Sequence, residues 1–221
     1  MRPYDARMSD PGASNPDAVH DHGPLHVSDL DPDPIAQVGA WLADAEAAGV
    51  VLANAMALAT SGSDGAPSVR HVLLRHITET GVTFFTNRTS RKARELAENP
   101  RAAAALYWRE LDRQVCLRGA VTELSAGDSD TYFATRPRDA QLGAWASEQS
   151  RPLEDRATLE RRVDEARERF ADREVPRPEQ WGGYLLTPDE VECWQGRPYR
   201  LHDRFRYRRD NGGWKLERLY P

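Results

Sequence analysis

The chain has 221 residues, of which 39% are hydrophobic and 8% aromatic, a composition typical of a soluble globular protein. Its formal net charge of −5 argues against non-specific nucleic-acid binding, which needs a basic surplus to neutralise phosphates. No apolar run approaches the roughly 20 residues of a membrane helix, and Cys116 and Cys193 lack metal-site spacing. The N-terminus has no secretory-type apolar segment, so a cytoplasmic protein is expected.

Residues 1–30 are rich in Pro, Asp, Gly, Ser and Asn and contain almost no large apolar side chains. Such a segment cannot bury enough surface to offset the entropy lost on ordering, which predicts a mobile N-terminal tail. A single domain is then expected over residues 31–221. The histidines at 20 and 22 are interpreted as solvated tail residues, and no metal site is expected.

A helix is predicted within residues 31–49, because Asp33 can cap it, Pro34 suits its first position and apolar residues form one stripe. After it, short β-type runs alternate with turn sequences, which is typical of an antiparallel meander. These runs cover residues 55–60, 68–77 and 82–87.

The second half of the chain returns from helices to strands. A helix is expected from residue 91, capped by Thr89 or Ser90 and ending before Pro100, and helical patterning recurs over residues 127–171. The other runs have strand patterning, and Asp210–Gly213 carries a hairpin signal. They cover residues 102–108, 113–124, 182–196, 199–209 and 214–221, and the stretch WQGRPYRLHDRF, 194–205, is itself interpreted as strand.

This order of elements predicts an α+β fold built round an antiparallel sheet or barrel. There is no βαβ alternation, and neither GxGxxG nor a phosphate-binding P-loop sequence occurs. The commonest nucleotide-binding signatures are therefore absent, and any cofactor site must be built from other residues.

Three local groups of cations are candidates for such a site, although each alone is commonly just solvated surface. Arg91 and Lys92 begin a helix, where cations oppose the positive end of the helix dipole unless an anion is bound there. This conflict predicts a phosphate site, which Arg70 and the strand end 85–87 could complete. In a strand over residues 194–205, the side chains of Arg200, His202 and Arg204 would share one face.

A second anion site is predicted from the sequence TYFATRPRDAQLGAWASEQS, where two arginines flank a proline between helical stretches. Its polar and aromatic members could hold an anion together with Arg200 and His202. They are Tyr132, Arg136, Arg138, Gln149 and Ser150.

At these residues the chain resembles the pyridoxine (pyridoxamine) 5′-phosphate oxidase family. The resemblance covers about residues 30–221 and rests on SRKARELAENP, RPRDAQLGAWASEQS, VPRPEQWGGYLL and WQGRPYRLHDRF. It implies an FMN-binding split β-barrel and a homodimer with FMN at the subunit interface. It also implies oxidation of pyridoxine or pyridoxamine phosphate to pyridoxal phosphate, with O₂ reduced to H₂O₂.

The resemblance also implies the role of each site residue. Arg200 would lie over the substrate ring opposite the flavin, and His202 would contact the substrate. Substrate binding would further involve Arg75, Tyr132, Arg136 and Ala140. FMN contacts would fall on Arg70, His71, Val72, Leu73, Leu74, Arg75, Phe85, Thr86, Arg91, Lys92, Gln114, Gln149, Ser150, Trp194 and Arg204.

Three departures from the family pattern affect substrate identity more than flavin binding. The family usually has lysine at the position of Arg75 and serine at that of Ala140, and its N-terminal substrate-covering motif is only faintly echoed by MRPY. Two alternatives stay open: a related flavin oxidase of the phenazine type, and a non-catalytic FMN- or pyridoxal-phosphate-binding protein. The expected partners are a phosphorylated B6 vitamer, O₂ and a second copy of the chain, with no nucleic acid or membrane.

Overall fold

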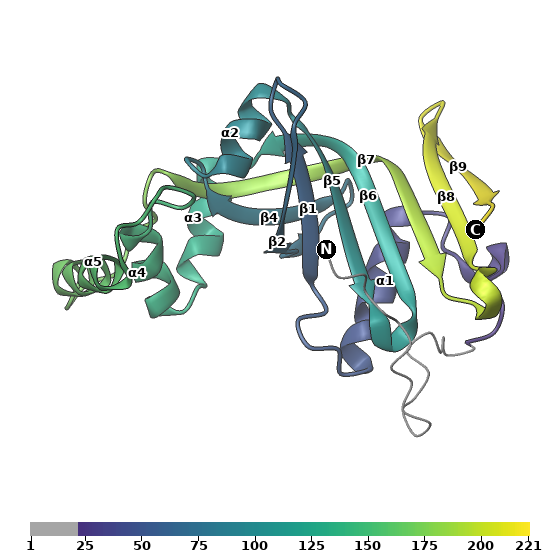
Figure 1. Cartoon of the computed structure of the whole chain (residues 1–221), viewed down its shortest axis with the longest axis horizontal. Coiled ribbons are helices and arrows are strands. Elements are labelled where there is room, and N and C mark those ends of the chain that lie inside the picture. Colours follow the sequence, from purple (N-terminus) through teal and green to yellow (C-terminus); the bar gives the residue numbers. More distant parts are fainter. Residues whose placement is uncertain (1–21) are drawn as a thin grey trace, which may run out of the picture.

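The computed structural model describes residues 22–221 (Figure 1), so the sequence predictions that fall on residues 1–21 lie outside the described residues. Helices and strands alternate in blocks along the chain. The helical segments are η1 Val27–Asp29, α1 Pro34–Ala47, α2 Arg91–Glu98, η2 Arg109–Leu111, α3 Ala126–Ala134, α4 Arg138–Ala146, α5 Arg156–Arg169 and η3 Pro198–Arg200. The strands are β1 Ala55–Ser61, β2 Pro67–Leu73, β3 His76–Ile77, β4 Val82–Asn87, β5 Arg101–Trp108, β6 Arg113–Glu123, β7 Trp181–Gln195, β8 Asp203–Asp210 and β9 Gly213–Leu219.

All the strands belong to one curled antiparallel sheet with the order β2-β1-β5-β6-β7-β4-β3, and β8 joins β7 to β9. The predicted α+β class with an antiparallel barrel is confirmed. The simple meander expected over residues 55–87 is wrong, because β2 and β3 stand at opposite ends of this order. Alternation of apolar residues identifies strands but not their partners, and β4 pairs instead with β7, about 100 residues later in the chain.

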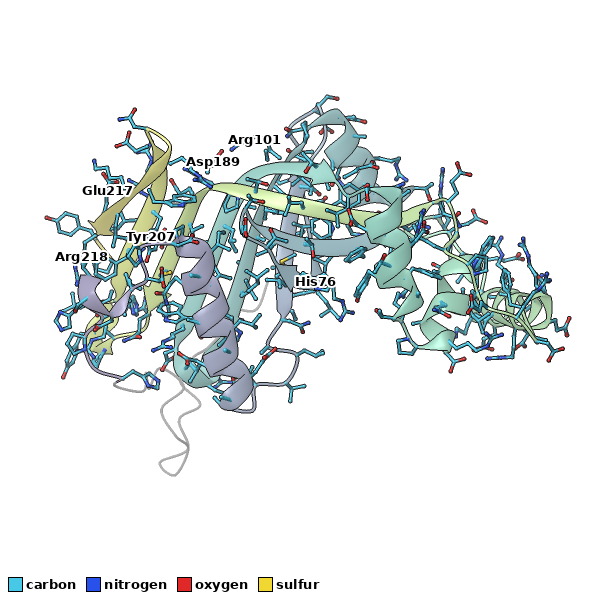
Figure 2. All side chains as sticks on the ribbon, turned by 180° about the vertical axis from the view of Figure 1, so that it is seen from behind. His76, Arg101, Asp189, Tyr207, Glu217 and Arg218 are labelled. Atoms are coloured by element: carbon cyan, nitrogen blue, oxygen red, sulfur yellow. The ribbon has the colours of Figure 1, made fainter. Side chains whose placement is uncertain are left out.

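The main core lies between this sheet and α1, which crosses strands β5 and β6 in Figure 2. The predicted helix stripe is the buried face: Val38, Trp41 and Ala45 are at most 3% exposed. The predicted cap also forms, since the backbone N–H of Ile35 donates to Asp33 Oδ1 at 2.9 Å. None of the helices within residues 22–221 has the length and apolar character that crossing a membrane requires.

A second, smaller core joins α3, α4 and α5 to the start of β7. Phe133, Leu142, Phe170 and Trp181 are its largest buried members. This cluster holds the helices of residues 126–169 against the sheet where β4 and β7 run side by side (Figure 1). It therefore fixes the position of the arginines that flank Pro137.

Packed structure begins before residue 31, earlier than the predicted end of the tail. Leu25 and Leu30 are buried in the main core, at 3% and 8% exposure. Two side chains of the C-terminal hairpin, both labelled in Figure 2, hold this segment: Arg218 Nη2 donates to Leu25 O at 2.8 Å, and Tyr207 donates to Asp31 O at 2.7 Å. The prediction rested on the polar composition of residues 1–30, which gave too little weight to Leu25 and Leu30, the two residues that anchor this segment in the core.

The single strand predicted over residues 194–205 is also wrong. β7 ends at Gln195, which pairs with Asp203 at the start of β8, so residues 196–202 form the connection between two antiparallel strands. Pro198 lies in the short helix η3, and Tyr199 and Arg200 take left-handed backbone angles, with φ of 60° and 61°. Arg200 and His202 therefore lie in a loop, and only Arg204 is in a strand.

Candidate functional site

A cavity of about 340 Å³ lies between the β4–β7 ribbon and the helices α3 and α4. Four residues that line it are ones to which the family resemblance assigns substrate binding: Arg75, Tyr132, Arg136 and Ala140. The structure thus brings together side chains separated by more than 50 residues in the chain. Its other lining residues are Phe85, Thr86, Asn87, Gly143, Ala144, Ser147, Gln149 and Trp181.

One wall of the cavity is an aromatic stack. The ring centroids of Phe85 and Tyr132 are 4.0 Å apart, and those of Phe85 and Trp181 are 5.3 Å apart, with all three rings nearly parallel. His76, labelled in Figure 2, meets the Tyr132 ring edge-on at 5.5 Å. Such rings give a flat apolar surface for an aromatic ligand.

Arg136 brings an unsatisfied positive charge to this wall. Its Cζ atom lies 4.7 Å from the Trp181 ring centroid, and its Nη1 is buried without a hydrogen-bond partner within the described chain. Burial lowers the pKa of Arg136, and nearby Arg75 acts in the same direction. A buried, unpaired guanidinium N–H is costly, and an anionic ligand in the cavity would satisfy it.

The ammonium group of Lys92 lies behind the same cavity. Although Lys92 lies in the first turn of α2, the residue is only 6% exposed, and Nζ donates to Gln149 Oε1 at 2.8 Å and to Thr86 Oγ1 at 3.0 Å. Burial is the main cause that lowers the pKa of Lys92 to about 8, with Arg70 acting in the same direction and Glu95 opposing. Lys92, Thr86 and Gln149, three predicted cofactor contacts, thus form one cluster.

Arg70 and Arg91 meet beside this cluster through a carboxylate that the sequence reasoning overlooked. Arg70 Nη2 lies 3.3 Å from Glu95 Oε2, and Arg91 Nε donates to Glu95 Oε1 at 2.7 Å. The predicted clustering of Arg70, Arg91 and Lys92 at the start of α2 is therefore present. Glu95 is one turn after Arg91, so the i, i+4 spacing of an arginine and a glutamate was the signal from which this carboxylate could have been predicted.

A second group of predicted residues forms a row across the other end of the sheet. Gln114 of β6 pairs with Trp194 of β7, which in turn pairs with Arg204 of β8, so their side chains share one face. Arg204 makes a two-point ion pair with Glu192, at 2.8 and 3.0 Å. This hydrogen bonding raises the pKa of Arg204.

His202 joins this row through its ring, whose centroid lies 4.6 Å from that of Trp194. The backbone N–H of Arg197 donates to His202 Nδ1 at 3.1 Å, so the proton of the neutral ring is on Nε2. Burial lowers the pKa of His202, and the charge of Arg200 acts in the same direction. Arg200 itself is exposed in the 196–202 loop.

The remaining predicted cofactor contacts have different positions. His71, Val72 and Leu73 continue β2 after Arg70, and Ser150 follows Gln149 with a left-handed φ of 71°. Leu74 is a core residue at 3% exposure. Its backbone N–H donates to Asn54 O, and its carbonyl oxygen accepts from the side chain of Asn54, so the cofactor contact at Leu74 stays a prediction.

The cavity and the cross-strand row lie at opposite ends of β7. Phe85 pairs with Gly183, and Trp194 follows Gly183 by eleven residues (194 − 183) along the strand. At about 3.3 Å per residue the two groups are separated by roughly 35 Å of strand, which is longer than one mononucleotide. Figure 1 shows β7 running from the α3 and α4 side of the molecule to the β8 side.

Several cavity residues were not found from the sequence. Gly143, Ala144, Ser147 and Trp181 are small or aromatic residues with no charge pattern to mark them, whereas Asn87 belongs to the strand end 85–87 that the sequence suggested for the phosphate site. The available signal was the recurrence of small residues at 140, 143 and 144 on α4 and at 147 just after it, because this spacing favours one helix face.

The fold and these groups define a class of protein: a split antiparallel barrel with a cationic, aromatic-walled ligand cavity. Residues 42–170 match the family described as "Pyridoxamine 5′-phosphate oxidase", and residues 181–221 match the "Pyridoxine 5′-phosphate oxidase C-terminal dimerisation region". The chain belongs to the pyridoxamine 5′-phosphate oxidase family. The matched dimerisation region contains Trp194, His202 and Arg204.

Proteins named pyridoxine/pyridoxamine 5′-phosphate oxidase are similar over most of their length. The one from Rubrobacter xylanophilus is 53% identical over 191 residues, covering 86% of this chain and 88% of that protein. The one from Ralstonia nicotianae, numbered 1, is 52% identical over 198 residues, covering 89% of this chain and 93% of that protein. The resemblance found in the sequence motifs is confirmed.

Two solved structures are similar to this fold. PhzG from Burkholderia lata, determined in complex with tetrahydrophenazine-1-carboxylic acid, is 38% identical and superimposes with a TM-score of 0.85 over 90% of this chain and 98% of that one. An FMN-binding protein from Nostoc punctiforme, 19% identical, reaches a TM-score of 0.69 over 87% of this chain and 100% of that one, a likeness of fold alone. The split-barrel prediction is thereby confirmed.

Proposed function

We propose that the protein is an FMN-dependent oxidase that converts pyridoxamine 5′-phosphate or pyridoxine 5′-phosphate to pyridoxal 5′-phosphate, with O₂ reduced to H₂O₂. The observation that carries this proposal is the cavity with aromatic walls and an anion-binding end. Arg75, Tyr132 and Arg136 line it, and Arg136 keeps a buried Nη1 without a partner in the described chain. A phosphorylated aromatic ring matches both features.

The residues around α2 fit the phosphate of FMN. Arg70, Arg91 and the buried Lys92 converge near the helix start, where cations are unfavourable unless an anion is bound. We assign Gln149 and Thr86 to the same end of the cofactor, and Gln114, Trp194 and Arg204 to another part of it. Bound flavin supplies a hydride acceptor that O₂ can reoxidise, and the protein supplies orientation and electrostatics.

We infer that each complete site contains residues of two chains. The cavity group and the Gln114–Trp194–Arg204 row are separated by roughly 35 Å measured along β7, which favours an arrangement in which one FMN contacts the two groups on different chains. In a twofold-symmetric dimer, the cavity of one chain can be completed by the row of the other. The family's dimerisation region, which matches residues 181–221, supports this arrangement.

We assign Arg200 and His202 to contacts with the reacting substrate. The tautomer of His202 leaves Nε2–H available as a donor, since Nδ1 is occupied by the backbone of Arg197. The exposed guanidinium of Arg200 is free to lie over a ring bound on the partner's flavin. The left-handed backbone at residues 199 and 200 sets the direction in which Arg200 leaves the loop.

Purified protein reconstituted with FMN tests the proposal directly. With pyridoxamine or pyridoxine 5′-phosphate, we expect pyridoxal 5′-phosphate and H₂O₂ to appear in equal amounts, and unphosphorylated pyridoxine to be a much poorer substrate. Flavin binding without turnover of any vitamer would instead support the alternative of a non-catalytic flavin or pyridoxal-phosphate carrier.

A phenazine-type oxidase is the second candidate, because this fold is similar to that of PhzG. In addition, Ala140 leaves more room in the cavity than a serine would. The three charged or polar groups at the anion end favour a phosphorylated substrate instead. Oxidation of a reduced phenazine carboxylic acid at a rate equal to that of pyridoxamine 5′-phosphate would favour the second candidate.

A further inference from the structure

A buried carboxylate lies inside the group of cations assigned to the cofactor phosphate. Glu95 is 8% exposed, and its Oε2 accepts hydrogen bonds from the hydroxyls of Thr60 and Ser68, both at 2.5 Å. The same oxygen lies 3.3 Å from Arg70 Nη2, whereas Oε1 accepts from Arg91 Nε at 2.7 Å. A negative charge at a site for an anion is unexpected and calls for a physical reason.

The two oxygens of Glu95 have different surroundings. Around Oε2 the network is closed, because Arg70 also donates to Thr60 Oγ1 at 2.6 Å, to Ser68 Oγ and to Leu58 O at 3.1 Å. Each Nη group of Arg70 therefore has two acceptors. These hydrogen bonds hold Oε2 and the Arg70 guanidinium against β1 and β2.

Oε1 faces a more exposed partner. The side chain of Arg91 is 59% exposed, and within residues 22–221 Glu95 is its one hydrogen-bond partner. An exposed guanidinium on a long side chain can exchange one acceptor for another at small cost. Arg91 is thus able to leave Glu95 when a stronger anion is present.

We propose that Glu95 is the internal counter-anion of the phosphate site: its Oε1 holds Arg91 while the site is empty and releases it to the phosphate of the cofactor. This role rests on the proposed FMN binding. Three cations and one carboxylate leave a net charge of about +2, which matches a phosphate monoester at neutral pH.

The charge of Glu95 has opposite effects on the two states of the site. In the empty state it neutralises clustered cations and stabilises the fold, whereas in the loaded state it repels the phosphate and competes for Arg91. Burial alone would favour the protonated acid, but the hydrogen bonds from Ser68, Thr60 and Arg91 bring the pKa of Glu95 down to about 2. The carboxylate is therefore charged throughout the working pH range.

Glu95→Gln tests this role, because it removes the charge and keeps the shape. We expect the flavin-free variant to melt at a lower temperature than the wild type. It should nevertheless bind FMN about threefold to tenfold more tightly, while its affinity for riboflavin, which has no phosphate, stays within about twofold. Inorganic phosphate should raise the melting temperature of the variant more than that of the wild type.

Two further variants serve as controls. Glu98→Gln changes a glutamate of the same helix whose hydrogen bonds within residues 22–221 all come from Ser63, and it should leave both affinities unchanged. In Glu95→Gln combined with Arg91→Ala, the gain in FMN affinity should disappear, since the exchanged guanidinium is gone.

Three results would overturn the inference: weaker or unchanged FMN binding by Glu95→Gln, an equal gain for riboflavin, or a gain that survives Arg91→Ala. If Glu95→Gln does not fold, NMR of the wild type decides, because the Arg91 Nε–H resonance must move on addition of FMN and not of riboflavin. An unmoved resonance rejects the role. A wild-type chain that binds no FMN would instead reject the proposed function.

Discussion

At the scale of single residues, the cavity combines permanent charges with one missing hydroxyl. Arg75, Tyr132 and Arg136 offer two charges and a hydroxyl to a phosphate, and Ala140 on the same wall offers only a methyl group. Since charge-assisted hydrogen bonds are about twice as strong as neutral ones, the arginines should dominate binding. Substrate recognition is therefore expected to tolerate the alanine.

Ala140→Ser measures what that hydroxyl is worth. A neutral hydrogen bond contributes about 0.5–1.5 kcal/mol, so we expect kcat/KM for pyridoxamine 5′-phosphate to rise by at most about tenfold. Steady-state kinetics with phosphorylated and unphosphorylated vitamers checks this. A larger gain, or one equal for unphosphorylated pyridoxine, would contradict the assignment of this wall to the substrate phosphate.

The pKa of Lys92, about 8, predicts a pH dependence of cofactor binding. Phosphate favours the charged amine, so above pH 8 FMN binding must take up a proton, and the dissociation constant should rise by up to about tenfold per pH unit. Below that pH the amine is already charged and affinity should be flat. Flavin fluorescence titrations between pH 6.5 and 9.5 measure this dependence.

Lys92→Met removes the titrating group and nearly keeps its volume. The variant should bind FMN weakly at every pH, with no added loss above pH 8, while riboflavin binding should differ little between the two proteins. If the wild type shows the same slope with riboflavin as with FMN, Lys92 does not face the phosphate.

At the scale of elements, the connection between β7 and β8 determines which part of the site Arg200 and His202 can serve. Both belong to the 196–202 loop, whereas the flavin-assigned row is in regular strands. Arg200→Ala and His202→Ala should each lower kcat/KM about tenfold or more, with flavin content and absorbance spectrum unchanged. A folded variant isolated without flavin would reassign that residue to the cofactor.

At Gly183, in the ribbon of β4 and β7, the side chains of Phe85 and Leu124 leave no space for a Cβ. A Cβ there would lie 2.6 Å from the Phe85 ring and 2.6 Å from Leu124, so Gly183→Ala must displace the aromatic wall. We expect a loss of about 1–3 kcal/mol in the free energy of unfolding, measured by denaturant titration.

Gly143→Ala is the matched comparison, because its Cβ would meet nothing within 4 Å inside a helix. This change should stabilise α4 by about 0.5–1 kcal/mol. Equal effects of the two substitutions would show that the space around Gly183 relaxes without cost.

At the scale of the whole molecule, the length of β7 separates the cavity from the row, and the proposed function completes each site with a second chain. We expect Arg136→Ala, altered in the cavity, and His202→Ala, altered beside the row, each to retain at most about a tenth of the wild-type activity when refolded alone. After unfolding and refolding as an equal mixture, random pairing should restore about a quarter of wild-type activity, because each mixed dimer contains one intact site.

No recovery in that mixture, although mixed dimers are demonstrated by mass spectrometry, would place both residues in a site formed by one chain. Wild type mixed with Arg136→Ala, and wild type mixed with His202→Ala, are refolded in the same way. Their activities show how much is lost during refolding itself.

The sequence by itself determined the features that depend on neighbouring residues. Asp33 and Pro34 start α1, and Asp210–Gly213 turns β8 into β9, with Asn211 and Gly212 at positive φ. The family motifs were equally local, and they predicted the split barrel and the four cavity residues assigned to the substrate. Caps, turns and contiguous motifs are determined by residues a few positions apart, so no knowledge of the sheet is required.

Only the tertiary structure decided which distant segments meet. It paired β4 with β7, buried Lys92 against Gln149, put Glu95 between Arg70 and Arg91, and interrupted the expected strand at 194–205 with a loop over residues 196–202. The alternation of side chains in a strand carries no record of its partner, and a charged residue can be either solvated or buried according to what packs over it. The roughly 35 Å of β7 between the two halves of the site is a property of the assembled sheet.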